Sequence, residues 1–248
     1  SKRPKNCLLI LTLQFRLFGF PIVIHWIFWL NTALMGGALG ADSPEAFRSM
    51  LAWVLACFVS ILIHELGHAF AMRSFGDRSV AIVLYAFGGF ARGSRLFTRS
   101  QDLQLTAAGP GLQIAFGLAV GWSMTLWRIP SPWLREAADA FTVVSLFWAL
   151  LNLVPILPLD GGRLCAASLG RMRPALVISL VCAVLLALSG MQSGLWLDMQ
   201  NTILKTIDIR AHTRVGGGMF TLIFFGMMAF NNWKQLQGEP QIPWMNAR

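Results

Sequence analysis

Long apolar runs constrain this chain more than any other feature of its sequence. A helix needs about 20 mostly apolar residues to cross a lipid bilayer. Six stretches satisfy this requirement, at about 22–40, 50–73, 103–127, 139–159, 174–197 and 217–234. The sequence therefore predicts an all-α polytopic membrane protein with about six transmembrane helices.

Composition and charge agree with a location in the lipid bilayer. Of the 248 residues, 56% are hydrophobic and 12% are charged, whereas soluble domains carry about 25% charged residues. The formal net charge is +9. The arginines, however, lie between apolar stretches and not on one polar face with interleaved aromatics. This distribution argues against a nucleic-acid partner and indicates membrane orientation.

The positions of the basic residues predict which way the chain is inserted. With six spans, 14 of the 20 Lys and Arg residues fall in segments on the side of the N-terminus. Cytoplasmic segments of membrane proteins carry the excess of Lys and Arg. We therefore expect a multi-pass integral membrane protein with both termini in the cytoplasm.

Two regions have the composition of strands. Residues 79–97 are rich in β-branched and aromatic residues around Gly88 and Gly89, and residues 11–24 partly alternate between apolar and polar. We expect a small membrane-associated β-sheet or hairpin beside the helices. Because no linker, repeat or low-complexity tract interrupts the chain, residues 1–248 are predicted to form a single domain.

The stretch ILIHELGHAF, residues 61–70, places three ionisable side chains inside an apolar run. Such residues are disfavoured at membrane depth and indicate a functional site by default. On a helix, His64 and His68 lie one turn apart on the same face and can bind one metal ion. Glu65 then lies beside the metal, where a general base would act on water. The alternative is a chance occurrence of the HExxH pattern.

A third ligand is expected from NLVPILPLDGG, residues 152–162. Pro155 and Pro158 should break the fourth helix, because proline cannot continue the hydrogen-bonding pattern. Asp160 follows this break, at the same membrane level as the two histidines in the predicted topology. Three protein ligands and one open position are typical of catalytic zinc. The alternative for Asp160 is an acid in a solvated loop.

Together, HELGHA and NLVPILPLDGG resemble the motifs of the site-2 protease family of intramembrane zinc metalloproteases. The resemblance implies that His64, His68 and Asp160 bind one Zn²⁺ and that Glu65 activates water. It extends over most of the chain, to four less specific motifs: GFPIVIHW at 19–26, FGGFA at 87–91, AAGPG at 107–111 and AFNNWKQLQ at 229–237. One departure is Gln113, where the family often has asparagine. No PDZ or CBS module is expected in this minimal core.

The resemblance implies hydrolysis of peptide bonds in transmembrane proteins or peptides near the cytoplasmic face. Asn152 is the best candidate for stabilising the oxyanion, with a structural amide as the alternative. A transmembrane substrate must unwind before attack, and the extended segment could pair with a strand edge near Gly88 and Gly89. These two glycines could equally form a bend in a membrane hairpin.

Two other functions remain open from the residues. The chain could be a catalytically silent membrane metalloprotein that acts as a binding scaffold, although Glu65 is needed only for hydrolysis. It could also be a metal transporter, although its buried polar residues gather at one level instead of lining a path. The sequence assigns no role to His25 or to residues 198–217, and identifies no regulatory membrane protein.

Overall fold

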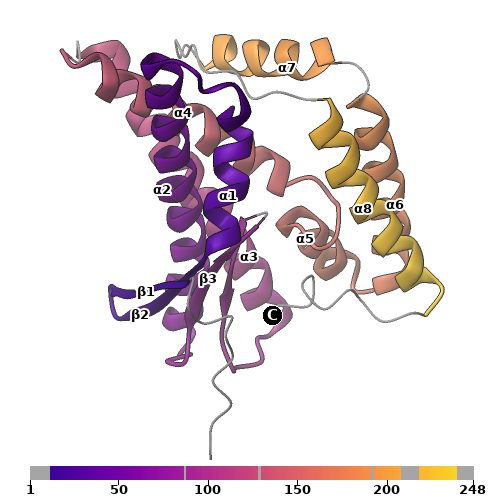
Figure 1. Cartoon of the computed structure of the whole chain (residues 1–248). Helices are drawn as coiled ribbons and strands as arrows, with labels where there is room; N and C mark the ends of the chain where they lie inside the picture. Colours follow the sequence, from indigo (N-terminus) through magenta and orange to yellow (C-terminus); the bar gives the residue numbers. More distant parts are fainter. Residues whose placement is uncertain (1–11, 87, 128–129, 191–192, 208–217, 239–248) are drawn as a thin grey trace, which may run out of the picture.

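The computed structural model describes residues 12–86, 88–127, 130–190, 193–207 and 218–238 (Figure 1). Helices form most of it, and a small mixed sheet lies beside them. The strands are β1 (Thr12–Leu17), β2 (Phe20–His25), β3 (Ala81–Tyr85) and β4 (Gly88–Arg92). The helices are α1 (Trp26–Met35), the 3-10 turn η2 (Ala38–Gly40), α2 (Pro44–Ser74), α3 (Arg99–Leu126), α4 (Pro132–Asn152), α5 (Asp160–Leu169), α6 (Met172–Ser189), α7 (Ser193–Thr206) and α8 (Met219–Leu236).

The longest element, α2, runs for 31 residues through the interior. The side chain of Ser43 accepts a hydrogen bond from the backbone of Ala46, and Pro44 occupies the first turn. Both features favour a helix start at this point. About 1.5 Å per residue gives α2 a length of roughly 46 Å, which exceeds the hydrocarbon thickness of a bilayer.

Three described helices, α2, α3 and α6, are long and apolar enough to cross a membrane. The chain is thus a helical membrane protein with a small sheet, and the count of six spans stays a prediction. The helix expected at 22–40 is wrong at its start, because residues 22–25 belong to β2. The helix that follows, α1, has only 10 residues, about 15 Å of rise.

The four strands pair in the order β1-β2-β3-β4. The pairs β1–β2 and β3–β4 are antiparallel, and β2–β3 is parallel. A parallel pair needs a crossover, which α1 and α2 supply. Alternate residues of β2, Phe20, Ile22 and Ile24, are buried against α2 residues such as Leu66. The expected sheet is confirmed, and β4 is left as an edge strand beside α2.

The fourth helix ends at Asn152, seven residues before the predicted end at 159, and the chain is irregular until α5 begins at Asp160. The predicted break is therefore confirmed, and it starts earlier than expected. Ser179 of α6 accepts a hydrogen bond from the backbone N–H of Leu157 at 2.8 Å. The Asn232 amide of α8 donates to the Leu157 carbonyl at 3.1 Å. These buried side chains fix the irregular segment that leads to Asp160.

The last helices form a second packing unit around α6 and α8, which stand together on one side of Figure 1. Ala183 and Ala187 of α6 pack against Phe224 and Phe225 of α8. The predicted stretch 174–197 is divided, because α6 ends at Ser189 and α7 starts at Ser193. From α7, Leu204 is buried against Val143 and Leu146 of α4.

A buried carboxylate ties the sheet to the end of α2. Asp77 accepts hydrogen bonds from the backbone and hydroxyl of Ser79, and from the backbone of Ser94 and Arg95, at 2.7 to 2.9 Å. Burial alone would raise the pKa of the Asp77 carboxyl, but these hydrogen bonds outweigh it and lower the pKa to about 2. The carboxylate thus joins the segments before β3 and after β4.

We expect Asp77→Asn to lower the stability of the detergent-solubilised protein by about 2 kcal/mol at pH 7, because an amide cannot accept all of these hydrogen bonds. Because the pKa of Asp77 is lowered in the folded state, ionisation of this carboxyl stabilises the folded state above about pH 4. This stabilisation is lost as the pH falls towards 2. The difference in thermal midpoint between the variant and the wild type should therefore shrink over this range.

The matched control is Asp42→Asn, which removes an exposed acid before α2. It should leave the thermal midpoint close to that of the wild type at every pH. Equal midpoints for Asp77→Asn and the wild type at pH 7 would contradict the structural role of this carboxylate.

Candidate metal centre

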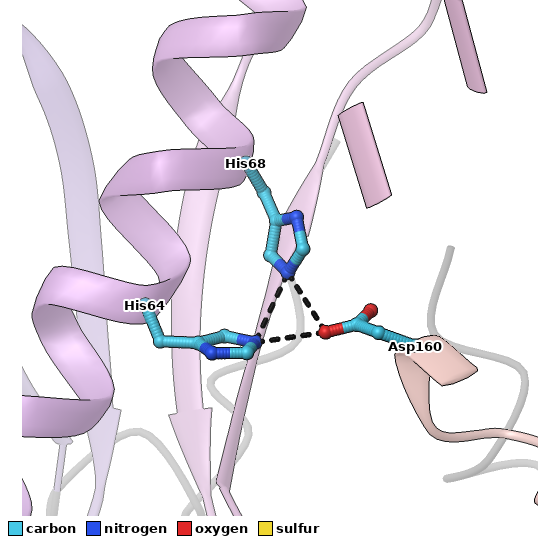
Figure 2. A group of neighbouring side chains, drawn as sticks. All are labelled: His64, His68 and Asp160. Atoms are coloured by element: carbon cyan, nitrogen blue, oxygen red, sulfur yellow. Dashed lines mark hydrogen bonds and ion pairs between the residues drawn. The ribbon is translucent and has the colours of Figure 1, made fainter. Parts of the chain in front are cut away.

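Three side chains predicted from the sequence to bind a metal converge in the structure (Figure 2). The Nε2 atoms of His64 and His68 lie 2.9 and 3.2 Å from Oδ2 of Asp160. The two Nε2 atoms are 3.1 Å apart. Both histidines project from α2, whereas Asp160 is the first residue of α5 (Figure 2). The helical spacing and the break after α4 together bring them to one point.

The other ring nitrogen of each histidine has an oxygen partner. Nδ1 of His64 lies 2.8 Å from Oε1 of Gln113, and Nδ1 of His68 lies 2.8 Å from the carbonyl of Leu105. These oxygens only accept, so each Nδ1 carries a proton and donates the hydrogen bond. The two Nε2 atoms therefore face each other and the Asp160 carboxylate.

This arrangement fits a metal ion. Three electron-pair donors that face one another at about 3 Å repel unless a cation or a proton lies between them. All three residues are buried, with exposed fractions of 4% or less, so water does not screen the repulsion. Two imidazoles and one carboxylate form a ligand set that suits zinc and leaves one position open.

Glycines let the neighbouring helix approach this cluster. A Cβ atom on Gly109 of α3 would collide with the ring of His68, and one on Gly67 of α2 would lie 2.5 Å from the carbonyl oxygen of Ala108. The AAGPG motif at 107–111 thus has a steric function in this fold. Gly161 and Gly162 serve similarly, because added Cβ atoms there would overlap the backbone of the preceding irregular segment.

A chain of buried polar groups holds Gln113 in place. Its Nε2 donates to the hydroxyl of Ser60 at 2.8 Å, and the Ser60 and Ser145 hydroxyls are 2.9 Å apart. These contacts link α3, α2 and α4, and they orient the Gln113 amide with Oε1 towards His64. Ser60 and Ser145 were missed by the sequence interpretation; the available signal was a polar residue within each of two apolar helices.

Glu65 lies next to the cluster on α2. It is 2% exposed, and its Oε2 has no hydrogen-bond partner within the described part of the chain. Gly89 of β4 lies against it, since an added Cβ atom would be 2.6 Å from Cγ of Glu65. A buried carboxylate oxygen without a partner is costly and is therefore available for a water molecule or a substrate proton.

The remaining predicted residues have different surroundings. Asn152 is the partly buried last residue of α4, and its catalytic role stays a prediction. Gly88 begins β4 with a positive φ of 138° and has open space on its Cβ side. His25 ends β2 and packs edge-on against Tyr85, with its Nδ1 buried and without a partner among the described residues.

Sequence comparison places the chain near proteins named zinc metalloproteases. It is 29% identical to Rip3 of Mycobacterium tuberculosis over 215 residues, which cover 73% of this chain and 53% of the relative. It is 28% identical to the zinc metalloprotease MJ0392 of Methanocaldococcus jannaschii, over 63% of this chain and 45% of the relative. The chain thus spans about half the length of these curated relatives. No protein-family model matches it.

Structure comparison identifies the fold. The site-2 protease from Methanocaldococcus jannaschii superposes with a TM-score of 0.58 at 20% sequence identity. The match covers 91% of this chain and 95% of the solved one. The likeness therefore extends over nearly all of the chain.

We expect Gln113→Leu to weaken metal binding, because it leaves Nδ1 of His64 without its acceptor. Loss of such a partner reduces metal affinity by about 10- to 100-fold. The dissociation constant can be measured by competition with a chromophoric chelator. The control is Gln104→Leu, which removes an exposed amide from the same helix and should leave the affinity unchanged. Equal affinities for both variants would contradict the positioning role of Gln113.

Proposed function

Since the chain belongs to the site-2 protease family of zinc metalloproteases, we propose that it is a zinc-dependent endopeptidase acting inside the membrane. The observation that carries this proposal is the convergence of His64, His68 and Asp160 beside buried Glu65, whose Oε2 has no hydrogen-bond partner among the described residues. Its substrates are transmembrane proteins or peptides, which it hydrolyses near the cytoplasmic face.

The three converging donors would hold one Zn²⁺. When bound, zinc supplies Lewis-acid chemistry, lowering the pKa of water and polarising a carbonyl group. The contribution of the chain is to keep both imidazoles in one tautomer through Gln113 and the Leu105 carbonyl. All three ligand residues are buried, which keeps them away from bulk solvent.

Glu65 performs the proton transfers of the reaction. Its carboxylate takes a proton from the water that attacks the peptide carbonyl, and then gives that proton to the nitrogen of the leaving amine. Hydrolysis thus adds one water across the C–N bond and yields a carboxylate and an amine. Asn152 remains our candidate for a donor to the oxyanion.

The substrate is proposed to bind as an added strand. A transmembrane helix hides its peptide bonds in its own hydrogen bonds and must unwind before attack. β4 is an edge strand of the sheet, and its residue Gly89 touches Glu65. An extended segment paired with this edge would pass the catalytic carboxylate, in the manner of β-augmentation. This contact favours the substrate role of Gly88 and Gly89 over a simple bend.

The proposed orientation has both termini in the cytoplasm. The excess of basic residues on the N-terminal side supports it. His64 and His68 lie in the second half of α2, which would then run inwards, so the cluster would lie towards the cytoplasmic face.

Oε2 of Glu65, which has no hydrogen-bond partner in the described part of the chain, also favours a protease over a scaffold. A scaffold that only binds a metal or a helix has no use for a buried carboxylate without a hydrogen bond, which destabilises the fold. A transporter would need polar groups along the whole path of the ion, whereas His64, His68 and Asp160 meet at a single point between α2 and α5.

We expect Glu65→Gln to abolish cleavage of a transmembrane substrate, with a loss of at least about 10²-fold for removal of a general base. Zinc content should remain close to one ion per chain, because the three ligand atoms are untouched. The measurements are metal analysis and cleavage in detergent or liposomes. The control is Glu45→Gln, an exposed acid in the first turn of α2.

Full activity of Glu65→Gln would rule out the catalytic assignment. Loss of zinc from the same variant would assign Glu65 to metal binding. Movement of metal ions across liposomes at a rate unaffected by Glu65→Gln would favour a transporter.

Strand addition makes its own prediction. Peptide substrates methylated on alternate backbone nitrogens around the cleaved bond lose donors needed for pairing with β4. We expect one of the two alternating methylation patterns to be cleaved at least about tenfold more slowly. The other pattern, whose methyl groups point away from the sheet, is the control. Identical rates for both patterns would contradict pairing along β4.

A further inference from the structure

A cavity lies beyond the end of β4, between that strand, α3 and α5. Its volume is about 420 Å³. Four charged side chains line it, those of Arg95, Arg99, Asp102 and Arg163, among apolar residues such as Leu96 and Phe97. It is separate from the metal cluster, and none of its charged residues belongs to the proposed catalytic machinery.

The lining of this cavity carries an excess of positive charge. Three guanidinium groups face one carboxylate, and that carboxylate is engaged, because Nη2 of Arg163 lies 2.9 Å from Oδ1 of Asp102. Nη1 of Arg163 is buried without a hydrogen-bond partner among the described residues. Arg99 donates to the carbonyl of Ser168, which holds its side chain over α5. A guanidinium fork matches the geometry of a carboxylate.

The cavity continues the line of β4 away from the metal centre. Gly89 touches Glu65, while Ala91 and Gly93, two and four residues further on, line the cavity. At about 3.3 Å per residue, Gly89 and Gly93 are roughly 13 Å apart along the strand direction. Met72, one helical turn after His68, and Leu105, which accepts from His68, form its inner wall.

We propose that this basic cavity binds acidic side chains of the substrate and so selects its sequence. The inference rests on the proposed function, because it places the substrate along β4. A residue paired near Gly89 lies at the reacting bond. Asp or Glu about two to five residues away, on the side leading out of the membrane core, then reaches the three arginines.

A peptide is favoured over a lipid headgroup by the position of the cavity. Its wall is formed by the end of β4 and the beginnings of α3 and α5, so it adjoins the strand that passes Glu65. A lipid would have to insert its headgroup between these elements. Its binding would make no use of strand pairing along β4.

The experiment measures binding of two labelled peptides to the Glu65→Gln protein, in which hydrolysis is blocked. Each peptide has a 20-residue apolar segment followed by Asp-Asp-Glu or by the neutral Asn-Asn-Gln. Fluorescence anisotropy in a neutral detergent gives the affinities. We expect the acidic peptide to bind about tenfold more tightly, as for hydrogen bonds between charged groups.

The arginine variants test the assignment. Arg95→Gln and Arg163→Gln, each added to Glu65→Gln, should reduce this preference to less than about threefold. Arg95 is exposed, so its substitution does not disturb the partly buried pair that Arg163 forms with Asp102. The matched control is Arg78→Gln, which removes an exposed charge between α2 and β3, outside the cavity lining, and should keep the tenfold preference.

Two results would overturn the inference. One is equal affinity for the acidic and neutral peptides, and the other is an undiminished preference in both cavity variants. If, in the second case, these variants also lose phosphatidylglycerol binding, the cavity is a lipid site. Cleavage of the neutral peptide by the wild type, but not by Glu65→Gln, tests the proposed function separately, so the two failures are distinguishable.

Discussion

The rest of this structure depends on the meeting of two imidazole nitrogens and one carboxylate oxygen inside an apolar protein. His64, His68 and Asp160 place these three donor atoms 2.9 to 3.2 Å apart, while the opposite nitrogen of each ring lies 2.8 Å from an oxygen of α3. Electron-pair donors at such distances, shielded from water, repel one another unless a cation or a proton lies between them. The fold around them holds two imidazoles and one carboxylate together, a ligand set that suits zinc, and that is the physical basis for assigning a metal centre.

Several otherwise unremarkable features serve this arrangement. Gly67 and Gly109 allow α2 and α3 to approach until the Leu105 carbonyl can accept from His68. Ser179 and Asn232 bind the backbone of the irregular segment that ends at Asp160. On the other side, β4 brings an open strand edge to Glu65, and its continuation leads to the basic cavity. The same strand would thus connect cleavage chemistry with the choice of substrate.

The sequence predicted the local parts of this site better than their surroundings. The spacing of His64 and His68 follows from helix geometry, and the break before Asp160 follows from the loss of hydrogen bonds at Pro155 and Pro158. Hydropathy alone misplaced the start of the first helix, because Phe20, Ile22 and Ile24 are as apolar as a transmembrane segment. They alternate as a strand, however, and are buried on one face of the sheet. The partners Ser60, Ser145 and Leu105 depend on how three helices pack, which no local pattern in one chain encodes.

X-ray absorption spectroscopy of the zinc-loaded protein tests the metal centre most directly. We expect one zinc per chain with two imidazole nitrogens at about 2.0 to 2.1 Å and a carboxylate oxygen at about 2.0 to 2.2 Å. In Asp160→Ala the carboxylate contribution should disappear while both imidazoles remain. A zinc ion ligated by thiolate sulfur, or by fewer than two imidazoles in the wild type, would contradict this assignment.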